Sequence, residues 1–152
     1  MDNKAIVRRF IEEYQSQGDV RVAEETLADD FVDHSPFGPL PPDREGVKQL
    51  FSTLRAAFPD LHAVVHDQSA DGDKVWTRKT FHGTNDGEFM GSPPTGKTVA
   101  FDVIDVVRLR DGQFVEHWNV VDALGLMQQL GAVPAPAWLG GSPTSRGCRD
   151  RP

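Results

Sequence analysis

Residues 99–121, VAFDVIDVVRLRDGQFVEHWNVV, decide the fold. Apolar side chains occupy almost every second position from Val99 to Leu109, a period that is typical of a strand with one buried face. The pair Asp111-Gly112 favours a tight hairpin turn, after which residues 114–121 return as a second strand. The stretch therefore predicts an antiparallel hairpin with one face turned toward a core.

Segments before this hairpin first show helical spacing, and after Pro59 the period of the apolar residues changes to two. Helices are expected at residues 6–18, 22–27 and 47–58, and further strands at residues 61–66 and 74–82. A last helix is expected between Asp122, its N-cap, and Gly131, which closes it. Helices first and antiparallel hairpins afterwards predict an α+β fold in which the helices cover one face of a curved sheet.

Length and composition limit the class of protein. The 152 residues suit one compact domain, and 38% hydrophobic with 26% charged residues is a globular composition. A net charge of −7 argues against a nucleic-acid partner, because no basic surplus exists to displace counterions from phosphates. No apolar run approaches the ~18 residues of a membrane span, and the start lacks the apolar stretch of a signal peptide. We expect a cytoplasmic, soluble protein with no membrane partner.

The domain is expected to cover residues 1–131, and residues 132–152, which hold Pro, Gly, Ser and Arg, are expected to form a loose tail. The single cysteine, Cys148, excludes an intramolecular disulfide and a thiolate metal cluster. Its place in the tail, with no base nearby in sequence, predicts an inert thiol.

Residues 91–98, GSPPTGKT, satisfy the pattern of a phosphate-binding loop. That loop works through successive backbone N–H groups at a helix N-terminus, and Pro93 and Pro94 remove two of these donors. The segment that follows also alternates as a strand. We interpret residues 91–98 as a connection between strands.

His62 and His66 have the i, i+4 spacing of a helical metal site. On a strand, however, four residues span about 13 Å, which is too far for one metal ion to bridge. Both are expected to face solvent, and no metal site is predicted.

Asp105 stands on the apolar face of the decisive strand, where an ionised carboxylate is costly unless it is paired. A two-residue turn would place it opposite Trp118, and a three-residue turn opposite His117 with Val103 facing Asn119. The second register would gather Asp105, His117 and Asn119 on one face, as in a binding pocket. The sequence barely separates the two registers.

In the functional interpretation, Asp105 orients His117 and raises its basicity, so that the imidazole exchanges protons near neutral pH. Asn119 could donate a hydrogen bond to a developing oxyanion. The alternatives are a structural His–Asp pair and a hairpin face covered by a partner subunit. His34 could reach the same cavity or could be an ordinary loop histidine.

Several of these stretches together resemble the SnoaL-like polyketide cyclases, which belong to the nuclear-transport-factor-2-like superfamily. The resemblance covers about residues 1–131, and it is carried by HGT at 82–84, GEFMGSPPTGK at 87–97, EHW at 116–118 and QQLG at 128–131. It implies a cone-shaped barrel, in which a strongly bent antiparallel sheet wraps around the N-terminal helices and encloses a deep apolar cavity. It also implies cofactor-free chemistry on aromatic polyketides, such as aldol ring closure in anthracycline biosynthesis. The residues expected to contact the substrate are Tyr14, His34, Phe51, Met90, Phe101 and Val103.

One position departs from the family pattern. The cyclases use an aspartate on the final strand as general acid/base, and the matching residue here is Asn119, which cannot take a proton from carbon. The family also contains members thought to hydroxylate anthracycline-type polyketides without a bound metal or flavin. We therefore expect first a hydroxylase of an anthracyclinone, in which His117, oriented by Asp105, deprotonates a phenol or dihydroquinone that then reacts with dioxygen.

Such chemistry needs a reduced substrate, so a separate quinone reductase is an expected partner. Aldol ring closure with Asp105 or His117 as the replacement base is the first alternative. A non-catalytic module that binds a small molecule or dimerises is the second. A homo-oligomer is expected in each case.

Overall fold

The computed structural model describes residues 1–134, so Cys148 and all but the first three residues of the expected tail lie outside the described residues. The helices are α1 (Asn3–Arg9), the π-helix η1 (Phe10–Ser16), α2 (Val20–Thr26), α3 (Arg44–Ala57) and α4 (Ala123–Leu130). The strands are β1 (Leu27–Asp33), β2 (His62–Asp71), β3 (Lys74–Thr84), β4 (Thr98–Arg110) and β5 (Gln113–Val121). No helix within this part of the chain is long and apolar enough to cross a membrane.

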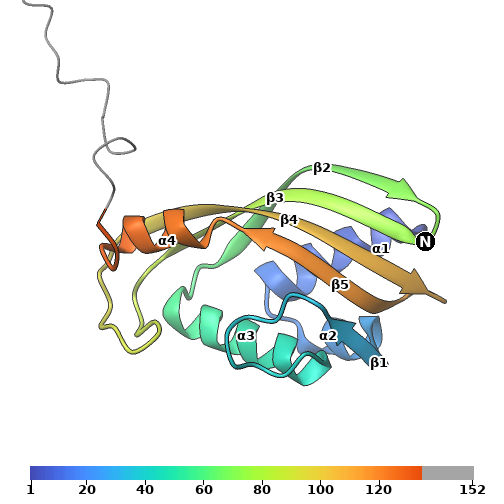
Figure 1. Ribbon diagram of the computed structural model, residues 1–152, viewed down its shortest axis with the longest axis horizontal. Helices are drawn as coiled ribbons and strands as arrows, with labels where there is room; N and C mark the ends of the chain where they lie inside the picture. The colour runs from blue at the N-terminus through green and yellow to red at the C-terminus, as the bar shows by residue number, and fades with distance from the viewer. Residues whose placement is uncertain (135–152) are drawn as a thin grey trace, which may run out of the picture.

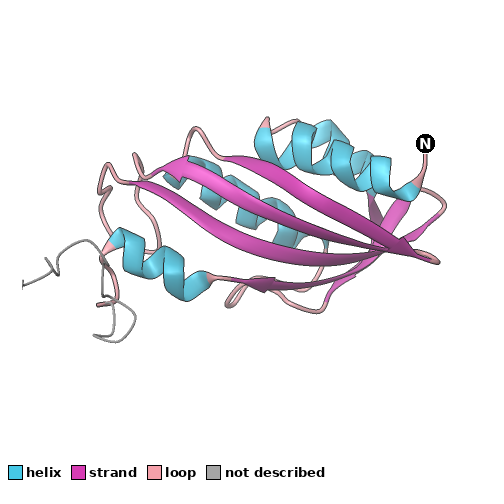
Figure 2. Cartoon of the chain, turned by 90° about the horizontal axis from the view of Figure 1, so that it is seen from above, coloured by secondary structure: helices cyan, strands magenta, loops and turns pink. Residues whose placement is uncertain are grey.

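The five strands form one curved sheet in the order β1-β5-β4-β3-β2. Helices α1, η1, α2 and α3 lie on its concave side, and α4 lies at one end (Figure 1). Seen from above, the long strands bend over the helices (Figure 2). The α+β class and the helix-covered curved sheet are therefore confirmed.

The bent sheet differs in two respects from the expected cone-shaped barrel of antiparallel strands. Strand β1 pairs with β5 in parallel, which makes the sheet mixed, and the two edge strands β1 and β2 do not pair with each other. Strand β1 contacts α2 and α3, whereas β2 contacts α1 and η1, so the helices stand between the two edges. The sheet stays open because this space is filled by helix.

The β4–β5 hairpin combines a short turn with a bulge. Asp111 and Gly112, with φ angles of 51° and 77°, form a two-residue turn between Arg110 and Gln113. Such positive φ angles at both central positions suit a type I′ turn. The register then shifts by one residue, because Phe114 pairs with Leu109 and Glu116 pairs with Arg108, which leaves Val115 as the extra residue of a bulge.

As a result, Asp105 pairs with Asn119, and Val107 pairs with His117. Both registers expected from the sequence are therefore wrong at Asp105, since neither included a bulge. The bulge nevertheless brings Asp105, His117 and Asn119 to the same face of the sheet, because residues two apart on a strand share a face.

Most of the remaining expectations are confirmed. Helix α4 begins after Asp122, whose side chain accepts a hydrogen bond from the Gly125 N–H, and ends at the left-handed Gly131. Residues 91–97 connect β3 to β4, and His62 and His66 are exposed on β2. Strand β1 was not expected.

The β3–β4 connection is fixed at its base by the buried side chain of Asn85. Its amide nitrogen donates to the carbonyl of Gly87 at 2.8 Å, and its oxygen accepts from the N–H of Thr95 at 2.9 Å. Gly87 packs so closely on α3 that a Cβ there would lie 2.1 Å from the carbonyl oxygen of Ala56. Two residues further along the connection, the side chain of Phe89 is buried.

Replacement of Gly87 by alanine is expected to destabilise the protein by about 1–3 kcal/mol, because neither backbone segment can yield without moving the loop or α3. Equilibrium denaturation measures the loss. Gly72→Asn is the control, since Gly72 has a left-handed φ of 59° that asparagine tolerates and no atom within 4 Å of a built Cβ. Equal stability of Gly87→Ala and the wild type would contradict the close packing.

Candidate active site

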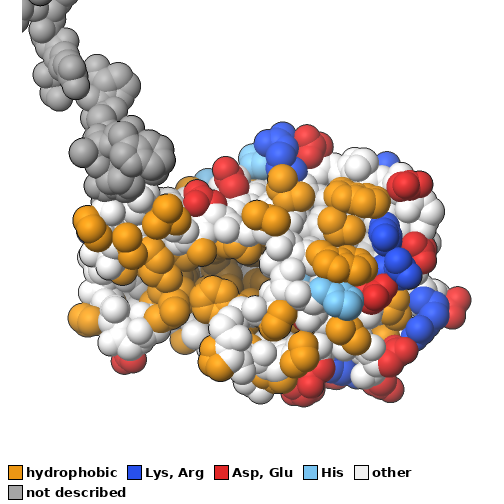
Figure 3. All heavy atoms as spheres, in the orientation of Figure 1, with side chains coloured by type: hydrophobic (Ala, Val, Ile, Leu, Met, Phe, Trp, Pro, Cys, Tyr) orange, Lys and Arg blue, Asp and Glu red, His pale blue; other side chains and the backbone are white. Residues whose placement is uncertain are grey.

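A cavity of about 300 Å³ lies between the concave face of the sheet and helices η1, α3 and α4. It opens to the surface through a hollow rimmed by hydrophobic side chains (Figure 3). Its aromatic walls come from eight phenylalanines: Phe10, Phe31, Phe37, Phe51, Phe81, Phe89, Phe101 and Phe114. Its polar groups are Gln15, Asp33, Ser35, Lys79, Asp105, His117 and Asn119.

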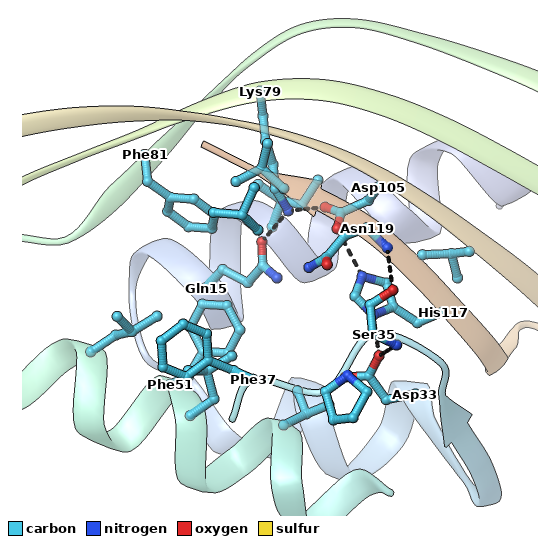
Figure 4. A pocket seen from close by; sticks show the side chains of 18 of the residues that line it. Gln15, Asp33, Ser35, Phe37, Phe51, Lys79, Phe81, Asp105, His117 and Asn119 are labelled. Atoms are coloured by element: carbon cyan, nitrogen blue, oxygen red, sulfur yellow. Dashed lines mark hydrogen bonds and ion pairs between the residues drawn. The ribbon is translucent and has the colours of Figure 1, made fainter. Parts of the chain in front are cut away.

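Four of these polar groups form a row of alternating charge across the sheet. Lys79 on β3 forms an ion pair with Oδ2 of Asp105 on β4, and Oδ1 of Asp105 lies 2.7 Å from Nε2 of His117 on β5. Nδ1 of His117 lies 3.0 Å from Oδ1 of Asp33 on β1. Each of four adjacent strands thus contributes one member (Figure 4).

Strand register explains why these side chains meet. Thr77 is opposite Asp105 and Lys79 is opposite Val103, so Lys79 and Asp105 are diagonal neighbours on one face. His117 is likewise diagonal to Asp105, whereas it pairs directly with Asp33 in the parallel β1–β5 ladder. The bulge in β5 and the parallel position of β1 are both required for this arrangement.

Burial and pairing shift the pKa values of Asp105 and His117 in opposite directions. Burial alone would raise the pKa of Asp105, but Lys79 and His117 outweigh it and hold that pKa well below its usual range. Burial alone would lower the pKa of His117, but its hydrogen bonds to Asp105 and Asp33 raise the pKa from 6.5 to about 9. At neutral pH the row therefore holds an ammonium, an imidazolium and the carboxylates that accept from them.

Three further polar groups complete the wall. Gln15 lies on the π-helix η1, and its Oε1 accepts from Nζ of Lys79 at 2.8 Å. The hydroxyl oxygen of Ser35 accepts from the backbone N–H of Asn119 at 3.1 Å. The side chain of Asn119 points into the cavity and makes no hydrogen bond within the described residues (Figure 4).

The structure brings together His117, Asp105 and Asn119, as expected from the sequence, and places Phe51, Phe101 and Val103 in the cavity wall. The other three expected substrate contacts are not in the wall; these are Tyr14, His34 and Met90.

The structure places each of these three side chains away from the cavity. Tyr14 is buried behind the wall, where its ring packs against Phe51 at 5.5 Å between centroids. The ring of His34 stacks on Trp118 at 4.7 Å, on the outer side of the sheet. Met90 is 60% exposed in the β3–β4 connection, with a φ of 51°.

Sequence reasoning missed Lys79, Asp33 and Gln15. A signal for Lys79 was present, because it interrupts the alternating inward positions Val75, Thr77 and Phe81 as Asp105 does on the next strand. Asp33 lies at the end of a strand rich in aspartate, a residue that is depleted in strands, and so the segment gave no strand signal. Gln15 faces inward beside Tyr14 in the π-helix, which helical periodicity does not anticipate.

An apolar cavity with one charged wall and an opening to the surface is suited to an enzyme that acts on a small, largely apolar molecule. An imidazole in this position can exchange protons, and the amide group of Asn119 can donate a hydrogen bond to a ligand oxygen.

Comparison with known proteins defines the family. The model of the family described as SnoaL-like polyketide cyclase matches residues 5–130, and the chain belongs to this family. It is 29% identical over 133 residues to the aklanonic acid methyl ester cyclase DnrD of Streptomyces peucetius, covering 83% of this chain and 88% of that protein. The protein is accordingly an enzyme, either a polyketide cyclase or a related enzyme of the same family.

Two solved structures are similar throughout. IdmH of Streptomyces antibioticus, a candidate polyketide cyclase, has a TM-score of 0.76 and 35% identity, covering 86% of this chain and 99% of that one. AclR of Streptomyces galilaeus, a candidate hydroxylase, has a TM-score of 0.79 and 30% identity, covering 90% of this chain and 85% of that one.

The raised pKa of His117 makes stability depend on pH. This contribution is fully present below pH 6.5 and is lost as pH rises through about 9, because the folded protein then gives up a proton it bound more tightly than the unfolded chain. The loss is expected to reach about 3 kcal/mol. Urea denaturation between pH 6 and pH 10 measures it.

Two variants isolate this effect. His34→Gln changes a residue outside the cavity and should keep the wild-type dependence of stability on pH. His117→Asn should be less stable than the wild type at pH 6 and should lose most of the fall in stability above that pH. An unchanged decline in His117→Asn would assign the effect to another group.

Proposed function

We propose that this protein closes a ring in an aromatic polyketide by an intramolecular aldol reaction. The observation that carries the proposal is the Lys79–Asp105–His117–Asp33 row on the wall of an otherwise apolar cavity. The cyclases among its relatives support this choice over the hydroxylase that the sequence favoured first.

His117 is the proposed proton acceptor. In its neutral form it takes a proton from a carbon activated by neighbouring carbonyl groups, and the pKa of about 9 makes it a stronger base than a free imidazole. Asp105 is a poor candidate for this role, because Lys79 and His117 hold its pKa well below the usual range. Asp105 and Asp33 instead stabilise the imidazolium that forms.

The same proton completes the reaction. The enolate carbon attacks the second carbonyl carbon, one carbon–carbon bond forms, and the resulting alkoxide takes the proton back from His117. Asn119 donates a hydrogen bond to the enolate oxygen. The product is an isomer of the substrate, and the sequence of steps needs no oxidant or reductant.

His117→Gln is expected to lower kcat at least 10²-fold, because proton transfer by a positioned group contributes about 10²–10⁴ in rate. The assay follows the conversion of aklanonic acid methyl ester, the compound that names the cyclase relatives, to an isomeric product. His34→Gln is the matched control and should keep wild-type activity, since its ring lies outside the cavity. Full activity in His117→Gln would exclude this residue as the base.

The pH profile gives a second test. Only neutral His117 accepts a proton, so kcat/KM is expected to rise about tenfold per pH unit and to level off near pH 9. Asp33→Asn removes one acceptor of the imidazolium, so its midpoint should move toward lower pH. A wild-type profile that falls between pH 7 and pH 9 would instead make the imidazolium the reactive form.

Hydroxylation is the second candidate, favoured by the carboxamide of Asn119 and by the similarity to AclR. In that reaction a dihydroquinone or phenol is deprotonated by His117, and the electron-rich anion then reacts with dioxygen as the electron acceptor. One oxygen atom enters the product and the other leaves as water, with two electrons from a separate quinone reductase and NADPH.

One incubation separates the two candidates. A purified anthracyclinone or its open-ring precursor is supplied with oxygen, a quinone reductase and NADPH, and the products are weighed by mass spectrometry. Ring closure is expected to give an isomer with or without oxygen. An oxygen-dependent product heavier by one oxygen atom would support hydroxylation instead.

A further inference from the structure

The ammonium of Lys79 has more hydrogen-bonding capacity than its partners use. Its side chain is only 2% exposed, yet it carries three protons and has two acceptors, Asp105 Oδ2 and Gln15 Oε1. Its remaining neighbour of note is the ring of Phe81, whose centroid lies 5.0 Å from Nζ. Lys79 belongs to the cavity wall, so its third proton is available to a bound molecule.

Two amide groups offer further donors beside it. Lys79 can only donate, so the amide oxygen of Gln15 must face it, and the amide nitrogen must face elsewhere. Neither that nitrogen nor the side-chain amide of Asn119 has a hydrogen-bond partner within the described residues. Figure 4 places both amide groups between Lys79 and the open cavity.

The balance of charge decides which ligand group suits these donors. Two cations and two carboxylates form the row, so it has no net charge, and three of the four carboxylate oxygen atoms already accept from Lys79 or His117 or the Ser35 N–H. Unused donors therefore outnumber unused acceptors on this wall. A ligand oxygen with a negative charge accepts several hydrogen bonds, and each is stronger in apolar surroundings than in water.

We propose that Lys79, Gln15 and Asn119 together bind the ligand oxygen as an anion, namely the enolate of a dicarbonyl or the phenolate of a hydroxylated aromatic ring. The inference rests on the proposed function and deepens it, because it names the ionisation state in which the substrate is held. Delocalised anions of this kind suit the site, since the opposite walls are apolar and aromatic. Lys79 is thereby a catalytic residue that touches the substrate.

An optical experiment tests this without turnover. The probe is 1,4-dihydroxyanthraquinone, whose phenolate absorbs at longer wavelength than its phenol. Spectra of the free and the protein-bound probe are recorded from pH 6 to pH 10. Binding to the wild type is expected to lower the pH at which the phenolate appears by at least one unit, a tenfold shift of the ionisation equilibrium.

Every charged group that faces the probe oxygen takes part in this shift: Lys79, Asp105, His117 and Asp33. Lys79→Met removes a cation and leaves the row with a net negative charge, so the bound probe should ionise no more readily than in water. Gln15→Leu keeps all four charges and should lose part of the shift, and it provides the test if Lys79→Met does not fold. His34→Gln is the control and should match the wild type.

The outcomes are distinct from those of the activity assays. A bound probe that ionises as it does in water, or an undiminished shift in both Lys79→Met and Gln15→Leu, would overturn the inference. Failure of the wild type to bind the probe would overturn it as well. A wild-type shift that these variants lose, in a protein that converts no polyketide, would uphold anion binding and reject ring closure.

Discussion

Two positive and two negative charges, carried by Lys79, Asp105, His117 and Asp33, lie where the sheet and helices exclude most water. A buried charge is tolerated only when it is paired, and loss of one partner typically costs about 3–5 kcal/mol. The row therefore constrains every strand that contributes to it. A shift of one residue in any of these strands would turn a charged side chain away from its partners.

The pairing of these four charges depends on the irregular parts of the fold. The bulge at Phe114 and Val115 sets β5 so that His117 is diagonal to Asp105 rather than on the opposite face. The parallel pairing of β1 brings Asp33 directly beside His117. The π-helix turns Gln15 toward Lys79. Together these features place four paired charged side chains on one wall of a cavity whose other walls are aromatic and aliphatic.

The charge balance of the row also explains why a carboxamide, rather than a carboxylate, suits position 119. A carboxylate at this position would give the wall a net negative charge and would compete with an anionic ligand. A carboxamide leaves the row neutral and adds a hydrogen-bond donor. In the proposed mechanism, His117 is therefore the base, whereas Asn119 and Lys79 hold the oxygen on which charge develops.

Much of the fold and three of the seven polar groups of the cavity wall could be predicted from the sequence. Alternation in residues 99–109 and the turn at Asp111-Gly112 were enough for the central hairpin, and Asp105 stood out because a charge on an apolar face needs a partner. The register of that hairpin could not be predicted, since a bulge depends on packing rather than on local pattern. Strand β1 and its Asp33 form through tertiary pairing against poor local propensity.

The ionisation state of His117 shows directly whether the row holds a buried positive charge, and nuclear magnetic resonance of the labelled imidazole measures it. The alternating row predicts that both ring nitrogens stay protonated from pH 6 to pH 8 and that the pKa lies near 9. A pKa at or below 6.5, with one ring nitrogen unprotonated at pH 7, would contradict the account, because the carboxylates of Asp105 and Asp33 would then not be stabilising a positive charge between them.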